Sequence, residues 1–132
     1  MNLVSIRLIT GDIQRLVGFY QHLTGVEATW ATPDFAEIVT PSGTLAIGST
    51  RTVALFAAGS AHPADNHTAI IEFLVPDVDA DYQRLRDTVD DFVNEPTTMP
   101  WGNRSLLLRD PDGNLINLFT PVTAQAVAKF AR

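Results

Sequence analysis

The sequence repeats one strand-and-helix pattern about 65 residues apart, and this repeat restricts the possible folds more than any other feature. An alternating apolar segment at residues 4–9 leads to Asp12, and a similar segment at 69–75 leads to Asp77. Asp is a favoured N-cap, and after each Asp the apolar residues recur at the three- and four-residue spacing of a helix. Two copies of one unit usually pack about a pseudo-twofold axis, so we expect a small-ligand cleft between them.

Each copy continues into three further segments of strand character, so the predicted unit is β-α-β-β-β. For module one, about residues 1–56, the predicted elements are strands at 4–9, 26–30, 35–40 and 44–49 and a helix from Asp12 to Gly25, with 52–56 as a strand extension or a separate short strand. For module two, about 68–121, they are strands at 69–75, 91–95, 104–109 and 115–120 and a helix at 77–89. Asp110 to Asn114 contain the Asp-Gly pair of a hairpin turn. A small, polar linker at about 57–67 joins the modules, and a short helical tail follows at 122–132.

Composition limits the class of protein. A chain of 132 residues with 45% hydrophobic residues suits one domain with a real core. The net charge is −6 and basic residues form no run, so we expect neither nucleic acid nor an anionic membrane as a partner. Without cysteine there are no disulfides or thiolate sites, which agrees with a cytoplasmic location. No apolar run reaches the roughly 18 residues of a membrane-spanning helix.

Strand alternation predicts which side chains line the cleft. A helix must cover the apolar face of the first strand of each copy, so the opposite face is left open to a ligand. We align the fourth strands of the copies through Gly43 and Gly113. The predicted lining is then a mostly apolar groove, which includes Ile47 and Ile70, with a few polar members: Ser5, Arg7, Glu72 and Asn117. Such a mixture is typical of small-molecule sites.

Three motifs give the chain a family resemblance. They are Gly11-Asp12…Gly18-Phe19-Tyr20…Leu23-Thr24-Gly25, then Pro76-Asp77-Val78-Asp79-Ala80, and above all Trp101-Gly102-Asn103-Arg104…Arg109-Asp110-Pro111-Asp112-Gly113-Asn114-Leu115-Ile116. With the doubled pattern they make nearly the whole chain resemble the vicinal oxygen chelate superfamily, which includes glyoxalase I, bleomycin-resistance proteins and extradiol dioxygenases. The resemblance implies an α+β fold in which two βαβββ modules form an incomplete barrel, commonly within a homodimer.

Enzymes of that superfamily generally hold a divalent metal with His and Glu or Gln at equivalent strand positions. Carried over to this chain, those positions fall on Ser5, Ile47, Ile70 and Asn117. Aliphatic side chains coordinate nothing, and neutral Ser and Asn oxygens are weak ligands. The three histidines lie elsewhere, at His22, His62 and His67. We therefore expect no metal and no cofactor.

Other polar and aromatic residues leave alternatives open. Arg7 and Glu72 occupy matching places in the two copies, and they form either a structural ion pair or a site in which Arg7 binds an anionic group and Glu72 orients it or acts as a base. Trp101 is either a plug beneath its loop or an aromatic wall for a ligand. Arg104 points either into the groove or to water. We include both Trp101 and Arg104 in the predicted ligand-binding set.

The resemblance implies two main functions. The favoured one is metal-independent binding, in which a homodimer sequesters or recognises a small organic ligand in the groove between the modules. The alternative is a lyase, isomerase or oxygenase that uses non-standard metal ligands or acid–base chemistry on Arg7 and Glu72. A third possibility is an interaction module whose groove is vestigial. The sequence leaves open whether the chain is an enzyme and which ligand it takes.

Overall fold

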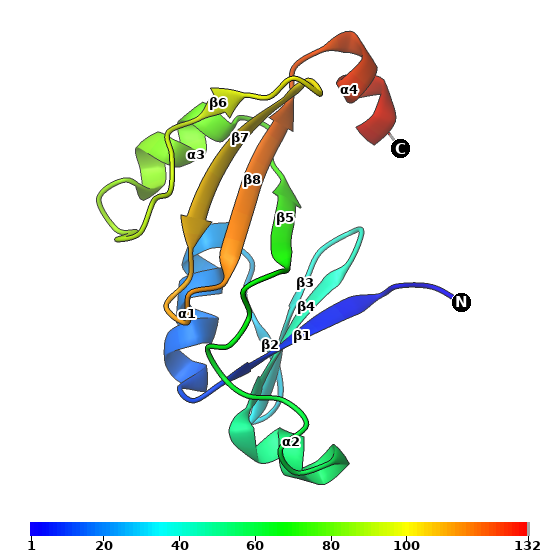
Figure 1. The fold of residues 1–132 in the computed structure, drawn as a ribbon, viewed down its shortest axis with the longest axis vertical. Helices are drawn as coiled ribbons and strands as arrows, with labels where there is room; N and C mark the ends of the chain where they lie inside the picture. Colours follow the sequence, from blue (N-terminus) through cyan, green and yellow to red (C-terminus); the bar gives the residue numbers. More distant parts are fainter. Residues whose placement is uncertain (132) are drawn as a thin grey trace. The chain divides into compact units, whose positions relative to one another are not determined.

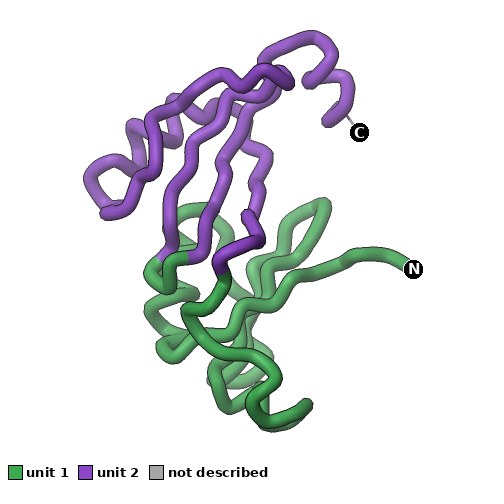
Figure 2. Tube along the Cα trace, in the orientation of Figure 1, with its two compact units in different colours: residues 1–66, 111–113 green, residues 67–110, 114–132 purple. Residues whose placement is uncertain are grey.

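A computed structural model describes residues 1–131, and the chain divides into two compact units (Figure 2). Unit 1 contains Met1–Asn66 together with Pro111–Gly113. Unit 2 contains residues 67–110 and the chain from Asn114 onward. No helix within the described residues is long and apolar enough to cross a membrane.

Unit 1 is a four-stranded mixed sheet with two helices (Figure 1). Its elements are β1 (Ser5–Thr10), α1 (Ile13–Thr24), β2 (Thr29–Thr32), β3 (Phe35–Val39), β4 (Thr44–Ser49) and α2 (Thr50–Phe56). The strand order is β1-β4-β3-β2. β1 runs parallel to β4, and the other pairs are antiparallel.

Unit 2 repeats this topology. Its elements are β5 (Ile70–Leu74), α3 (Val78–Leu85), β6 (Thr97–Thr98), β7 (Asn103–Arg109), β8 (Leu115–Pro121) and α4 (Ala124–Phe130). The order is β5-β8-β7-β6, with β5 parallel to β8. The predicted α+β class with two βαβββ modules is confirmed, and both sheets are open rather than closed.

Matching Asp residues begin the first helix of each unit. The side chain of Asp12 accepts a hydrogen bond from the Arg15 backbone N–H at 3.2 Å, and Asp77 accepts one from Ala80 at 3.2 Å. α1 ends at Gly25, whose φ of 70° is the left-handed conformation that glycine adopts without strain. Both caps and the end of α1 are confirmed, whereas α3 stops at Leu85 instead of continuing to residue 89.

A single helix covers one face of each sheet. In unit 1, α1 packs on β3 and β4, and the buried side chains of this layer are Leu8, Leu16, Val17, Tyr20, Leu23, Ala36, Ile38, Leu45 and Ile47. In unit 2, α3 packs on β7 and β8 over Ile71, Val78, Leu85, Leu106, Leu108, Ile116 and Leu118. Burial of apolar surface in these two layers is the main stabilising contribution to each unit.

The register of β4 corrects one predicted groove residue. Ile47 pairs with Leu8 and Ala36, both buried in the α1 layer, and its own exposed fraction is 0%. The expectation that Ile47 lies on the open face is therefore wrong. Ala46 occupies the open-face position, because it pairs with Arg7 in the way that Asn117 pairs with Glu72. The alignment through Gly43 and Gly113 was off by one residue, and a one-residue shift moves a strand side chain to the other face.

Residues 52–56 form a helix, which corrects the predicted strand. Ser49 caps α2, since its hydroxyl accepts from the Arg51 backbone N–H, and Thr52 donates its hydroxyl to the Ser49 carbonyl at 2.8 Å. These local bonds and the burial of Val53 outweigh the strand propensity of the segment. The last strand of unit 2 is also followed by a short helix, α4. The repeated unit is therefore β-α-β-β-β-α, and we call α2 and α4 the closing helices.

The predicted strand at 91–95 is also wrong. Asp91 and Val93 make backbone hydrogen bonds to β7, to Arg109 and Leu107 respectively, so this segment starts along the edge of the sheet. The Asn94 side chain then accepts from the Leu107 N–H at 2.8 Å. A side chain thus replaces the backbone partner and ends the pairing before a regular strand forms.

At one cross-strand pair, the large and the small residue exchange strands between the two units. On the open face of unit 1, Phe35 in β3 is paired with Gly48 in β4. At the corresponding place in unit 2, Ser105 in β7 is paired with Phe119 in β8. A Cβ on Gly48 would lie 2.7 Å from the Thr52 hydroxyl of α2, so the missing side chain lets the closing helix approach β4.

Candidate functional site on the open sheet faces

The sheet face opposite α3 carries most of the polar residues expected to bind a ligand in unit 2. β5 and β8 pair here in a fixed register, and β7 adds its alternate residues. The residues of this open face are Ile70, Glu72, Leu74, Ser105, Leu107, Leu115, Asn117 and Phe119. Glu72 and Asn117 are thus set among apolar neighbours, as the sequence predicted.

Glu72 and Asn117 form a hydrogen-bonded pair. The Asn117 Nδ2 donates to Glu72 Oε2 at 2.8 Å, because the strand register places the two residues side by side. The Asn117 Oδ1 is buried and has no hydrogen-bond partner among the described residues. Ser105, which is 4% exposed, likewise has a buried Oγ without a partner there. Buried polar atoms are normally satisfied, so these two oxygens represent unused hydrogen-bonding capacity.

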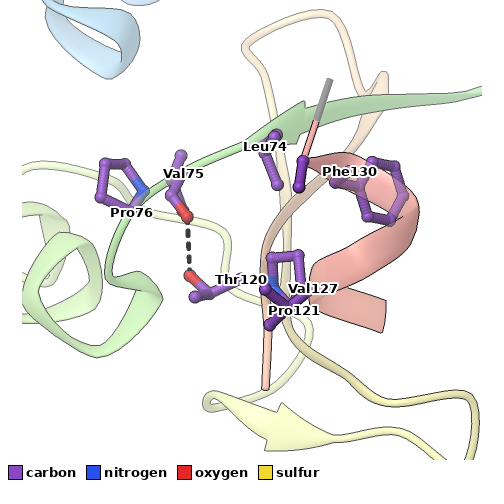
Figure 3. Close-up of a pocket in the computed structure, with 8 residues that line it drawn as sticks. Leu74, Val75, Pro76, Thr120, Pro121, Val127 and Phe130 are labelled. Carbon is purple, nitrogen blue, oxygen red and sulfur yellow. Dashed lines mark hydrogen bonds between the residues drawn. The ribbon is translucent and has the colours of Figure 1, made fainter. Parts of the chain in front are cut away.

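A shallow, open pocket of about 400 Å³, which we call the cavity, lies next to this face (Figure 3). It is lined by the ends of β5 and β8 and by α4, through Leu74, Val75, Pro76, Thr120, Pro121, Val127, Phe130 and Ala131. The Thr120 hydroxyl is occupied by a bond to the Val75 carbonyl at 2.9 Å, which leaves the lining predominantly apolar. Leu74 belongs to both the open face and the cavity.

On the open face of unit 1, the Arg7 side chain contacts two aromatic rings. Its guanidinium carbon lies over the Phe35 ring at 4.6 Å from the centroid and over the Phe56 ring at 5.2 Å. None of the ion pairs formed within residues 1–131 involves Arg7. Ala46 and Glu37 continue the row from Arg7 across β4 and β3. Arg7 and Glu72 belong to different units, so their pairing stays a prediction.

Arg104 lies on the other side of its sheet. Its Nε and Nη2 donate to the two carboxylate oxygens of Asp79 in α3, at 2.8 and 3.0 Å. These hydrogen bonds hold the pKa of Asp79 below its usual value and raise the pKa of Arg104. The structure thus gives Arg104 a helix-to-sheet ion pair in place of the expected position in the ligand-binding set.

Three further residues of the predicted set are exposed. Ser5 begins β1 and Ile70, with an exposed fraction of 47%, begins β5. Trp101 is 68% exposed in the turn before β7. Its exposure argues against a plug beneath the loop, and a role as a ligand wall stays a prediction.

The residues at the family's metal positions do not fit a divalent cation. With the corrected register these residues are Ser5, Ala46, Ile70 and Asn117, which offer two neutral oxygens and no imidazole or carboxylate. Across residues 1–131, no group of three or more His, Asp or Glu side chains could hold a metal ion. His22 lies in α1, and His62 and His67 are exposed between α2 and β5.

Sequence reasoning missed Phe56, Phe130 and Ser105. Each Phe is the last residue of a closing helix and touches an open-face side chain: Phe56 contacts Arg7, and Phe130 lies 5.2 Å from Phe119 in an edge-on arrangement. The alternation of Leu106 and Leu108 was a signal for Ser105, since it places Ser105 on the opposite face.

Comparison with known proteins agrees with this geometry. Residues 2–118 match the model of the Glyoxalase/Bleomycin resistance protein/Dioxygenase superfamily. An uncharacterized protein, YraH from Bacillus subtilis (strain 168), is 27% identical over 125 aligned residues, and the match covers 90% of this chain and 98% of YraH.

Solved structures show the same fold. A glyoxalase/bleomycin resistance protein/dioxygenase family enzyme from Burkholderia phytofirmans PsJN superposes with a TM-score of 0.81 at 17% identity, over 92% of this chain and 100% of that one. A glyoxalase/bleomycin resistance protein/dioxygenase from Nocardioides gives 0.75 at 22% identity, over 94% and 85% of the two chains.

Proposed function

Because the chain belongs to the Glyoxalase/Bleomycin resistance protein/Dioxygenase superfamily, we propose that it binds a small organic molecule without a metal ion, on the open face of unit 2. The ligand has an apolar body and at least one hydrogen-bond donor. Binding of this kind serves to sequester or recognise the molecule.

The unused oxygens on the open face carry the proposal. Asn117 Oδ1 and Ser105 Oγ are buried without partners among residues 1–131, and an unsatisfied buried polar group costs roughly 1–3 kcal/mol. A ligand that donates a hydrogen bond removes this cost once the side chain rotates to present its oxygen. The Glu72 carboxylate accepts one bond from Asn117, and its second oxygen adds a negatively charged acceptor. The chemistry favours a ligand with an amine, amide or hydroxyl group.

The adjacent cavity supports an apolar ligand body. About 400 Å³ lies within the usual range of roughly 300–1,000 Å³ for small-molecule sites. Leu74 connects the cavity to the Glu72 strand, two residues along β5. A compact aromatic amine is therefore a suitable probe.

Tryptamine tests this proposal. We expect a saturable rise in the melting temperature of the protein with tryptamine, since a ligand that binds the folded state stabilises it. Glu72→Gln should abolish most of the rise because it removes the charge that faces the ammonium. Glu95→Gln, an exposed carboxylate of the same unit, is the matched control and should leave it unchanged. No rise with the wild-type protein, or an equal loss in both variants, would contradict the proposal.

We also propose that the protein is a homodimer. β1 lies at the edge of its sheet, with Ile6 exposed in it and Leu3 and Val4 exposed just before it. Exposed apolar residues on an unpaired strand edge favour association with another copy. Native mass spectrometry reports the number of copies and any bound molecule together, and a monomer at micromolar concentration contradicts this assignment.

A further inference from the structure

We infer that Arg7 is an anion-recognition residue, and that the open face of unit 1 binds a carboxylate-type group. This inference goes beyond the proposed function, because it gives unit 1 a binding contact of its own and names the chemical class of group that this contact takes. It concerns a different unit from the Glu72 site, so the two are separable by experiment.

The first argument is the unused hydrogen-bonding capacity of Arg7. A guanidinium has five N–H donors in a planar fork that matches two carboxylate oxygens. Within the described part of the chain no acceptor bonds to Arg7, whereas Arg51 in the same unit is paired with Asp34 at 3.0 Å and Arg104 with Asp79 at 2.8 Å. Of these three arginines, Arg7 is the one whose fork is open to an incoming anion.

The second argument is that two aromatic rings position Arg7. Phe35 comes from β3 and Phe56 from the end of α2, and both rings lie within about 6 Å of the guanidinium carbon, the range of cation–π attraction. These cation–π contacts are not hydrogen bonds to a carboxylate, so they use none of the N–H donors of the Arg7 fork. A long side chain on an open sheet face thus acquires a preferred position, which lowers the entropy that an anion must remove on binding.

Packing in the hydrophobic core does not explain the position of Phe56. It is 76% exposed, so it contributes little to the core. Gly48 leaves room for the arrangement, because its missing Cβ would lie 3.7 Å from the Arg7 Cδ and 2.7 Å from the Thr52 hydroxyl. The closing helix therefore brings Phe56 over Arg7.

Glu37 limits which anions fit. It lies on the same face, two strands away from Arg7 in the row Arg7–Ala46–Glu37. Neighbouring strands are about 4.8 Å apart, so the backbones of Arg7 and Glu37 are separated by roughly 10 Å. Repulsion disfavours a ligand with a second negative charge on that side. The expected group is a single carboxylate.

Benzoate and its neutral isostere benzamide test the inference. With the ¹⁵N-labelled full chain, the Arg7 Nε–Hε resonance should shift saturably with benzoate and remain in place with benzamide. Arg7→Gln should identify this resonance by its loss and should weaken benzoate binding by about tenfold or more, since it removes a charged bidentate partner. Inorganic phosphate is a separate arm, and tighter binding of phosphate than of benzoate would overturn the carboxylate assignment.

Substitutions of the neighbours sharpen the test. Phe56→Ala should weaken benzoate binding about two- to fivefold, the size of an exposed cation–π contact. Leu55→Ala and Arg51→Gln are matched controls on α2 and should leave the affinity unchanged. Glu37→Gln should tighten binding, and Arg7→Lys should give an intermediate loss because it keeps the charge without the planar fork.

The outcomes separate the two proposals. Tryptamine binding without benzoate binding would overturn this inference and leave the proposed function standing, and the reverse result would do the opposite. Unchanged benzoate affinity in Arg7→Gln, or an equal loss in Arg51→Gln, would show that the anion responds to general surface charge and would overturn the role of Arg7.

Discussion

Arg104 on β7 donates two hydrogen bonds to the two carboxylate oxygens of Asp79 on α3, at 2.8 and 3.0 Å. This pair joins the helix of unit 2 to the side of the sheet that it covers. Since it lies on the face opposite Glu72 and Asn117, we expect this pair to contribute to stability rather than to ligand binding.

Breaking this pair should lower stability without changing binding. We expect Arg104→Gln and Asp79→Asn to reduce the melting temperature, while the tryptamine response of the folded protein stays at the wild-type level. The double variant should be little worse than either single variant, because both remove the same interaction. A loss of ligand affinity in Arg104→Gln at full folding would place this side chain in the site after all.

The Asp34 carboxylate should give the protein an acid-sensitive contribution to stability. The Ser49 hydroxyl donates to Asp34 at 2.8 Å and Arg51 donates at 3.0 Å, and these bonds lower the pKa of Asp34 below its ordinary value of 3.8. A depressed pKa means that the stabilisation is present above 3.8 and disappears as the pH falls through the lower, folded-state pKa.

This dependence is measurable by carboxyl NMR titration and by melting curves at acidic pH. Ser49→Ala should move the Asp34 midpoint upward, because it removes the larger of the two causes. It should also flatten the loss of melting temperature at acidic pH. An unchanged midpoint in Ser49→Ala would contradict the assignment.

Ile47 and Ile70 should respond differently to truncation. Ile47 is completely buried in the α1 layer, so Ile47→Ala should cost about 2–5 kcal/mol of unfolding free energy. Ile70 is 47% exposed at the start of β5, and Ile70→Ala should cost less. Urea denaturation measures both, and equal losses would mean that the β4 register is wrong.

The two repeated helix caps should be nearly equivalent. Asp12 and Asp77 each accept a hydrogen bond at 3.2 Å from the backbone N–H three residues later. Asp12→Ala and Asp77→Ala should each cost about 0.5–2 kcal/mol. Replacement by Asn should cost little, since its side-chain oxygen also accepts the bond. A neutral effect of both Ala variants would show that the caps are dispensable.

Metal removal should have no effect. The chain offers Ser5, Ala46, Ile70 and Asn117 at the metal positions of its family, and this set is a poor ligand for Zn²⁺ or Fe²⁺. We expect the melting temperature and the tryptamine response to be the same before and after dialysis against a chelator. One equivalent of a divalent ion in elemental analysis of the purified protein would contradict this expectation.

Much of the fold follows from the sequence because local signals agree with the tertiary structure. The Asp caps, Gly25 and the Asp110–Asn114 turn each set a boundary through local chemistry. The turn closes by a hydrogen bond from the Asn114 backbone to the Asp110 side chain at 2.9 Å, and Gly113 has a φ of 83°. The strands that flank this turn are correct to within a residue at either end.

Some errors arise where a side-chain hydrogen bond decides the outcome, and others where packing decides it. Residues 52–56 favour a strand by composition. They form a helix because the Ser49 side chain caps this helix and because Val53 is buried. Asn94 ends the predicted strand at 91–95 with a side-chain bond to Leu107. The face of Ile47 depends on a register that alternation alone leaves undetermined by one step. The candidate site was partly predictable, since Glu72 and Asn117 followed from alternation, whereas the Arg7 contacts depend on α2.

The large side chain of this strand pair lies on β3 in unit 1, as Phe35 opposite Gly48, and on β8 in unit 2, as Phe119 opposite Ser105. A side chain at Gly48 does not fit even where Phe35 is replaced by a small residue, because its Cβ would lie 2.7 Å from the Thr52 hydroxyl. The strand that carries the phenylalanine also determines which side chains lie next to its ring in each unit. On β3 it supports the cation of Arg7, and on β8 it is capped by Phe130 and presents no charge.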